Sequence, residues 1–285
     1  MSDPRLTARK GGIASLALEG RLDADAYRAP LAMQVSAPVA ALRIAPEGDA
    51  EQADQLIFGE PFDLIAEADG FGWGQARRDG YVGYVLMDAL SAPVLAPTHR
   101  VSALRTYAFS EPSIKSAIVG LYSLNGLVTI EAREGRFVKG ARSGWFIDHH
   151  LSKIGQFAAD PVAVAEQFLG APYQWGGRES LGLDCSGLVQ QAFYACGRAC
   201  PRDTDMQQDA FDQAVTPADL VRGDLVFWRG HVGLMRDSGT LIHANAHHMM
   251  VASEPLEAAI LRIEAAGSGL PTAYRRYRTP LGQGD

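Results

Sequence analysis

Residues 183–197 read LDCSGLVQQAFYACG and place a reactive side chain at the start of an apolar helical repeat. Apolar residues recur at the three- and four-residue spacing of one helix face: Leu188, Val189, Ala192, Phe193, Ala195 and Cys196. This spacing predicts a buried amphipathic helix over about 184–196. Asp184 is the expected N-cap, and Gly197 stands where a left-handed C-terminal cap belongs.

Cys185 falls in the first turn of this helix. Unpaired backbone N–H groups and the helix dipole there favour a thiolate over a thiol, and the same N–H groups can stabilise an oxyanion on an attacked carbonyl. Cysteines at helix starts are also common packing residues. The helix alone therefore leaves a nucleophile and a packing residue as equal alternatives.

A histidine pair changes that balance. Residues 231–236 and 240–246 read as two strands joined by the loop Asp237-Ser238-Gly239, with Gly239 expected in the left-handed conformation. If Arg236 faces Thr240, then Gly233 faces His243, so His231 and His243 lie on one face of the hairpin. A loop one residue longer would separate them. The pair predicts a base, His231, and an orienting residue, His243, for Cys185.

The region after residue 153 reads as α+β. A helix is expected over 161–169, ending at Gly170, followed by the cysteine helix and by several strands from Leu225 onward. We place the last domain at 153–285.

The preceding region, 31–152, reads as short strands separated by Gly, Asp and Pro. One expected strand covers 101–106. Residues 79–90 (DGYVGYVLMDAL) and 141–151 (ARSGWFIDHHL) share a turn, a glycine, an aromatic, an aliphatic and a closing leucine, which indicates duplicated units. Two unrelated β-meanders are the alternative. The closing strands resemble bacterial SH3-like domains, which implies two small β-barrels, at 31–95 and 96–152, after an N-terminal segment, 1–30.

Composition limits the function classes. The 285 residues are 47% hydrophobic and 21% charged with a net charge of −7, so neither disorder nor a polyanion-binding surface is indicated, and we expect no nucleic-acid partner. Residues 1–30 contain no apolar run of signal-peptide length, and no segment approaches membrane-spanning length. We therefore expect a cytoplasmic protein without a membrane partner. Three cysteines fit a reducing compartment.

The motifs together resemble the NlpC/p60 family of papain-like peptidases. They are Asp-Cys-Ser-Gly at a helix start, a later His-Val-Gly strand, a second histidine twelve residues on, and Pro-Tyr-Gln-Trp-Gly-Gly at 172–177. The resemblance implies a papain-like fold with Cys185 as nucleophile, His231 as general base and His243 as orienting residue. It also implies that Tyr173 assists the oxyanion or the substrate. This chemistry needs no cofactor.

Two SH3-like units before the catalytic domain are similar to intracellular enzymes that recycle murein peptides. Those enzymes cut between γ-D-Glu and the diamino acid and require a free L-Ala amine. The resemblance implies candidates for holding the small murein peptide, namely Asp184, Ser186, Asp203, Thr204, pocket-wall Trp175, and Glu60 with Tyr81 or Tyr84 from the first SH3-like domain. Thr204 departs from the family's Ser but keeps the hydroxyl.

Three alternatives remain open. A broader cell-wall hydrolase, or an amidase or acyltransferase, could share the fold, and the SH3-like pair could make the chain a non-catalytic wall binder. His247-His248 and Cys196 with Cys200 lack a matched metal-ligand set, so we predict no metal.

Overall fold

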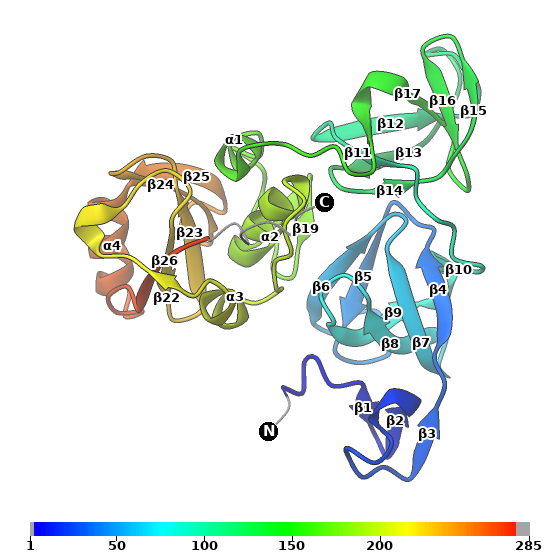
Figure 1. Ribbon diagram of the computed structural model, residues 1–285, viewed down its shortest axis with the longest axis horizontal. Coiled ribbons are helices and arrows are strands. Elements are labelled where there is room, and N and C mark those ends of the chain that lie inside the picture. The colour runs from blue at the N-terminus through cyan, green and yellow to red at the C-terminus, as the bar shows by residue number, and fades with distance from the viewer. Residues whose placement is uncertain (1–2, 278–285) are drawn as a thin grey trace, which may run out of the picture. The chain divides into compact units, whose positions relative to one another are not determined.

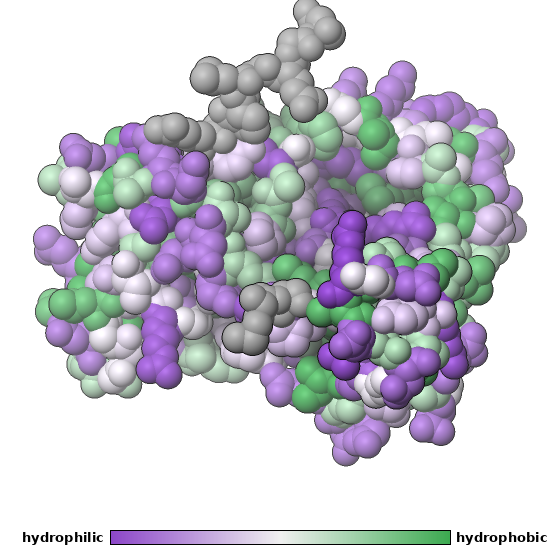
Figure 2. Space-filling model, turned by 60° about the horizontal axis from the view of Figure 1, so that its bottom comes forward, coloured by the Kyte–Doolittle hydropathy of each residue, from purple (hydrophilic) through white to green (hydrophobic). Residues whose placement is uncertain are grey.

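The computed structural model describes residues 3–277 and divides after Gln156 into two compact units (Figure 1). Among the described residues, no helix is long and apolar enough to cross a membrane. Hydrophilic and hydrophobic residues are interspersed over the face drawn in Figure 2.

Unit 1 begins with a small sheet and a larger one. The small sheet has the order β1-β2-β3, and the larger sheet has the order β10-β4-β7-β8-β9-β5-β6. A 3-10 helix, η1 (Leu16–Leu18), follows β2, and another, η2 (Met87–Ala89), precedes β10. The strands are β1 (Arg9–Lys10), β2 (Ile13–Ser15), β3 (Ala26–Arg28), β4 (Leu31–Val35), β5 (Val39–Arg43), β6 (Gln52–Ile57), β7 (Pro61–Ala68), β8 (Phe71–Ala76), β9 (Val82–Leu86) and β10 (Leu90–Ser91).

The second half of unit 1 has two sheets, with the orders β14-β11-β18 and β13-β12-β17-β16-β15. Its core packs Phe58, Tyr122 and Phe146 together with smaller aliphatic residues. The strand expected over 101–106 is wrong, because the chain leaves one sheet and enters the other between β11 and β12. The elements are β11 (His99–Val101), β12 (Arg105–Phe109), β13 (Ile118–Ser123), β14 (Leu127–Val128), β15 (Ile130–Glu134), β16 (Phe137–Gly140), β17 (Trp145–Ile147), η3 (Asp148–His150) and β18 (Leu151–Lys153).

The predicted repeat has a structural counterpart. In each copy a strand leads into a 3-10 turn and a short strand, β9-η2-β10 and β17-η3-β18. The shared glycine lies where a neighbouring strand comes close. A Cβ on Gly83 would lie 2.9 Å from the carbonyl oxygen of Arg43, and one on Gly144 would lie 2.5 Å from that of Phe109. Only glycine permits this backbone approach, which explains the Gly-aromatic pattern in both copies.

Unit 2 is α+β, as predicted. A six-stranded antiparallel sheet with the order β21-β26-β22-β23-β24-β25 lies between α2 on one side and α4 on the other (Figure 1). Trp228 and Met235 pack with α4 residues in the core on one side of the sheet. The elements are α1 (Pro161–Glu166), β19 (Arg178–Glu179), β20 (Gly182–Leu183), α2 (Cys185–Ala195), α3 (Thr204–Ala210), β21 (Gln213–Ala214), η4 (Pro217–Asp219), β22 (Leu225–Trp228), β23 (His231–Met235), β24 (Thr240–Asn245), β25 (Met250–Pro255), α4 (Leu256–Ala265) and β26 (Ala273–Arg276).

Both predicted helices around the site form, with one shortened. α2 is capped by Asp184 and followed by Gly197 at φ +70°, as expected. α1 ends at Glu166 instead of continuing to Leu169, because Gln167 and Phe168 donate to carbonyls three residues back and tighten the last turn.

Candidate active site

Cys185 is the first residue of α2. The Asp184 side chain accepts a 2.7 Å hydrogen bond from the Gly187 backbone N–H and so fixes where the helix begins. The backbone N–H groups of Ser186 and Val232 face the Cys185 sulfur and stabilise its thiolate form. Because Val232 follows His231 in the chain, this contact brings the β23 end of the hairpin to the cysteine.

Burial nevertheless raises the pKa of Cys185 to about 12, and the neighbouring Asp184 carboxylate acts in the same direction. The two backbone N–H groups only partly oppose this. The N–H groups at the helix start therefore act in the predicted direction, toward the thiolate. The desolvation of a side chain that is 7% exposed outweighs them and leaves a thiol in the resting protein, an effect that the prediction did not include. The thiol must lose its proton to a base as it reacts.

The β23–β24 hairpin has the predicted register. Leu234 pairs with Ile242 and Met235 with Leu241, so the parity that places His231 and His243 on one face is confirmed. Nε2 of His231 lies 2.8 Å from Nδ1 of His243. This hydrogen bond leaves Nδ1 of His231 as the nitrogen available to Cys185.

The hairpin loop corrects one detail. Gly239 is not in the left-handed region. Instead, the Asp237 carboxylate accepts hydrogen bonds from the Gly239 and Thr240 backbone N–H groups at 2.9 and 2.8 Å. An aspartate turn thus sets the loop length that the glycine was expected to set.

Both histidines are neutral in the resting site. Burial lowers the pKa of His231 to about 3, with a smaller contribution from His243. Burial also lowers the pKa of His243, although the Glu254 carboxylate acts in the opposite direction. A neutral thiol and a neutral imidazole suit general-base catalysis, in which the proton moves as the sulfur attacks.

Sequence reasoning missed Glu254 and Arg262. Oε1 of Glu254 lies 2.8 Å from Nε2 of His243 and is also bound by the Arg262 guanidinium. The hydrogen bond from His243 is the main cause that lowers the pKa of Glu254 to about 2. Leu241 pairs with Glu254 across β24 and β25, which puts Glu254 on the face of His243. Strand parity could have placed Glu254 beside His243 only if the length of the turn at 246–249, which sets the register of β24 and β25, had been known.

Tyr173 lies beside the chain that leads into the cysteine. It forms a parallel bridge with Leu183, two residues before Cys185. Burial raises the pKa of Tyr173, and the nearby Cys185 adds to the effect. The hydroxyl is therefore protonated and is able to donate a hydrogen bond near the nucleophile. Its predicted catalytic role stays a prediction.

The two expected ligands next to the cysteine belong to a buried network. Nη1 and Nη2 of Arg202 donate to the two carboxylate oxygens of Asp184 at 3.0 and 2.7 Å, and Nη1 also donates to Ser186 Oγ at 2.9 Å. Asp184 further accepts from the backbone N–H of Gly176 at 3.0 Å. Sequence reasoning gave Arg202 no role. Substrate contacts of Asp184 and Ser186 stay predictions, and a substrate ammonium would share this carboxylate with Arg202.

The other predicted ligands of unit 2 lie near this network. Asp203 precedes α3, Thr204 begins it, and both are half-buried. Trp175 is 62% exposed, as a residue of a pocket wall open to solvent can be. Their substrate contacts stay predictions.

The three predicted ligands of unit 1 lie in its larger sheet region. Glu60 is buried and forms a 2.7 Å ion pair with Arg78. Tyr81 is buried, and the Tyr84 ring lies 4.5 Å from the ammonium group of Lys10. Their role in closing a substrate pocket stays a prediction.

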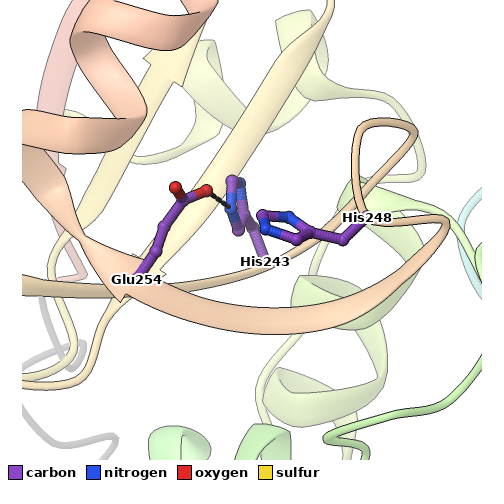
Figure 3. A group of neighbouring side chains, drawn as sticks. All are labelled: His243, His248 and Glu254. Atoms are coloured by element: carbon purple, nitrogen blue, oxygen red, sulfur yellow. Dashed lines mark hydrogen bonds and ion pairs between the residues drawn. The ribbon is translucent and has the colours of Figure 1, made fainter.

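One group in unit 2 offers metal-type donors. Ligand atoms of His243, His248 and Glu254 lie within 4.8 Å of one another (Figure 3). The sequence predicts no metal, and the residues considered there, His247-His248 and the cysteines, overlap this group only at His248. Each of the three already has a protein partner, and the positive charge of Arg262 adjoins the Glu254 oxygen. Hydrogen bonding therefore accounts for the cluster better than a cation does.

Residues 170–262 match the NlpC/P60 family, and residues 42–90 match the bacterial dipeptidyl-peptidase Sh3 domain. The chain is 28% identical over 236 residues to Dipeptidyl-peptidase 6 of Lysinibacillus sphaericus, covering 74% of this chain and 86% of that protein. It is 38% identical over 95 residues to the Gamma-D-glutamyl-L-lysine dipeptidyl-peptidase of Bacillus subtilis (strain 168), covering 30% of this chain and 32% of that protein.

The fold has a solved counterpart. An NlpC/P60 family protein from Bacillus cereus ATCC 10987 superimposes with a TM-score of 0.74 at 18% identity, over 87% of this chain and 99% of that one. The chain therefore carries an NlpC/P60-family cysteine peptidase domain, preceded by a bacterial dipeptidyl-peptidase SH3 domain.

Proposed function

We propose that this protein hydrolyses the bond between γ-D-glutamate and the diamino acid in short murein peptides that begin with a free L-Ala. One observation carries the proposal: a cysteine at a helix start lies next to a strand whose histidine is hydrogen-bonded to a second histidine at 2.8 Å. That is the nucleophile, base and orienting group of an acyl-transfer site.

In the first step, Sγ of Cys185 attacks the γ-carbonyl carbon while its proton passes to Nδ1 of His231. The oxyanion forms next to the backbone N–H groups at the start of α2 and the protonated Tyr173 hydroxyl. The imidazolium of His231 then gives its proton to the leaving amine. The C–N bond breaks, and a thioester to Cys185 remains.

In the second step, water attacks the thioester carbonyl and gives a proton to Nδ1 of His231. The C–S bond breaks, the glutamate γ-carboxyl is released, and the His231 proton returns to sulfur. No other reactant is required. Both steps use the neutral resting pair, because the low pKa of His231 keeps Nδ1 free to accept a proton.

The names of the relatives support the choice of bond. One relative is a Gamma-D-glutamyl-L-lysine dipeptidyl-peptidase and another is Dipeptidyl-peptidase 6. A dipeptidyl-peptidase must recognise the free amine of its substrate, which is a cation and needs acidic or hydroxyl partners. Unit 2 supplies such groups at two places in the chain. Two flank Cys185 and two directly follow Arg202, namely Asp184, Ser186, Asp203 and Thr204.

A broader cell-wall hydrolase is the second candidate, since the chain is also 36% identical over 122 residues to the bifunctional muramidase/DL-endopeptidase CwlT of Bacillus subtilis (strain 168). Mass spectrometry after incubation with L-Ala-γ-D-Glu-diaminopimelate, its N-acetyl form and purified murein separates the two. The proposal requires release of free diaminopimelate from the first peptide only. Equal cleavage of the acetylated peptide would reject the free-amine requirement.

Two controls complete this experiment. Cys185→Ala should abolish cleavage, and replacing diaminopimelate by L-Lys ranks the diamino acids. A third incubation adds an amine acceptor. If a new amide then forms in place of the free glutamate γ-carboxyl, the enzyme is an acyltransferase and not a hydrolase. The cytoplasmic location remains part of the proposal, and fractionation of producing cells tests it.

A further inference from the structure

The orienting histidine has a partner of its own. In Figure 3 the His243 ring lies between Glu254 and His248, with its Nε2 toward the Glu254 carboxylate. Its other nitrogen, Nδ1, is 2.8 Å from Nε2 of His231. Arg262 of α4 contacts the same carboxylate oxygen. A continuous chain of contacts thus runs from α4 through Glu254 and His243 to the catalytic base.

We propose that Glu254 is a positioning residue whose carboxylate fixes the tautomer of His243, and through it the tautomer of His231, leaving Nδ1 of His231 unprotonated toward Cys185. Neither the sequence motifs nor the family comparisons assign a role to Glu254 or Arg262. The inference rests on the proposed role of His231 as base.

The protons can be counted along this chain. An ionised carboxylate only accepts hydrogen bonds, so His243 must carry a proton on Nε2. A neutral His243 then has a lone pair on Nδ1, and His231 must donate to it from Nε2. Neutral His231 has no second proton, so its Nδ1 is free. After Nδ1 accepts the thiol proton, every hydrogen bond in the chain is kept.

The opposite arrangement would disable the base. If His243 carried protons on both nitrogens, Nε2 of His231 would accept, and Nδ1 of His231 would hold a proton toward Cys185. His243 is fully buried and lies near a second cation, Arg262, which disfavours the imidazolium. The low pKa of Glu254 keeps the carboxylate charged at neutral pH. The groups around the chain are His231 on β23, His243 on β24, His248 in the next loop, Glu254 on β25 and Arg262 on α4.

The test uses the full chain with Glu254→Ala and Glu254→Gln, and with Glu257→Gln as a matched control on the exposed side of α4. Glutamine keeps one acceptor oxygen for the His243 Nε2–H, whereas alanine keeps none. Nitrogen NMR of the imidazoles should show His231 and His243 as Nε2–H tautomers in the parent protein, in Glu254→Gln and in Glu257→Gln. In Glu254→Ala the two signals should become mixtures.

Two rates accompany the spectra. Peptide cleavage should lose about 100-fold in kcat with little change in KM for Glu254→Ala, about 10-fold for Glu254→Gln, and nothing for Glu257→Gln. Alkylation of Cys185 by iodoacetamide at pH 7 should fall in the same order. Because alkylation and NMR need no peptide, an error in the assigned substrate leaves these two measurements unaffected.

Three results would overturn the inference. The first is unchanged tautomers in Glu254→Ala, and the second is a lower kcat of Glu254→Ala with both tautomers and the alkylation rate as in the parent protein. The third is a shift of the His243 signals when the parent protein is treated with EDTA. The second would make Glu254 only structural, and the third would give its oxygen to a metal ion. If Glu254→Ala fails to fold because Arg262 loses its partner, the alkylation of Cys185 in Glu254→Gln is measured as a function of pH. Loss of the carboxylate charge beside His243 should shift this pH profile. An unchanged profile rejects the inference.

Discussion

Two carboxylate–arginine pairs flank the reaction centre, and they differ in what else they bind. Asp184 and Arg202 share their hydrogen bonds with backbone N–H groups and with Ser186. Glu254 and Arg262 share theirs with His243, which contacts His231. The first set contains no group that exchanges a proton with the reaction centre, so its main structural effect is to hold the backbone around Cys185 in place. The second contains imidazoles, whose protons can occupy either nitrogen.

Burial separates the two pairs as well. The Arg202 side chain is 1% exposed, and that of Arg262 is 24% exposed. A fully buried guanidinium that loses its partner cannot be rehydrated, whereas a partly exposed one can. Disruption of the Arg202 pair should therefore mainly reduce stability. Disruption of the histidine chain should mainly reduce the reaction rate.

The largest expected effect is on rate, in His231→Ala. We expect kcat/KM for peptide cleavage to fall by about 10⁴-fold or more, because the buried thiol loses the group that removes its proton. His149→Ala is the control, since that histidine is exposed and lies in unit 1. A fall of less than about 10-fold, measured by mass spectrometry of the products, would reject His231 as the base.

The next effect is on stability, in Arg202→Met. Its free energy of unfolding should fall by about 3–5 kcal/mol, because Asp184 stays buried without its counter-charge. All three cysteines lie in unit 2, so urea denaturation followed by labelling of the buried Cys185 and Cys200 reports this unit alone. Arg229→Met, at an exposed position, should change the value by about 0.5 kcal/mol or less.

A double variant separates the pair from the side-chain packing. Adding Asp184→Asn to Arg202→Met removes both charges and keeps an N-cap side chain. We expect it to recover more than half of the lost free energy. If the double variant is less stable than Arg202→Met, the cost lies in packing and the ion pair contributes little.

The contrast also explains what the sequence could predict. Helix spacing located α2, and strand parity brought His231 to His243, because both follow from local geometry. The Asp184–Arg202 and His243–Glu254 contacts depend on turns whose lengths local patterns do not set, at 197–203 and 246–249. The resting charge of Cys185 depended on burial, which a motif does not contain. Gly239 was misread because Asp237 satisfies the same turn through its side chain.

A smaller effect concerns pH. His231 has a pKa of about 3 when folded and about 6.5 when unfolded. The unfolded state therefore binds the proton first, so stability is complete above pH 6.5 and falls as the pH drops toward 3. The slope is about 1.4 kcal/mol per pH unit, which gives about 2 kcal/mol lost at pH 5. The lowered pKa of His243 acts in the same direction.

His231→Gln should flatten this profile for unit 2 between pH 6.5 and 5. The free energy of unfolding is measured at each pH by urea denaturation, and the exposed cysteines are labelled with an aromatic disulfide, a reagent that also reacts with thiols in acid. Glu254, with a pKa of about 2, loses its contribution only below about pH 4.5, outside this window. An equal slope in His231→Gln and the parent would show that His231 is already charged in the folded protein.

The smallest effect tests burial directly, at a surface arginine with two acidic partners. Arg222 lies 2.8 Å from Asp160 and 3.3 Å from Glu166, but its side chain is 40% exposed. Water and salt screen such pairs, so Arg222→Gln should cost about 1 kcal/mol or less, and 1 M NaCl should remove most of that. Thiol labelling in urea at low and high salt measures both values. A salt-resistant loss as large as that of Arg202→Met would mean that the number of partners, and not burial, decides what an arginine contributes in this unit.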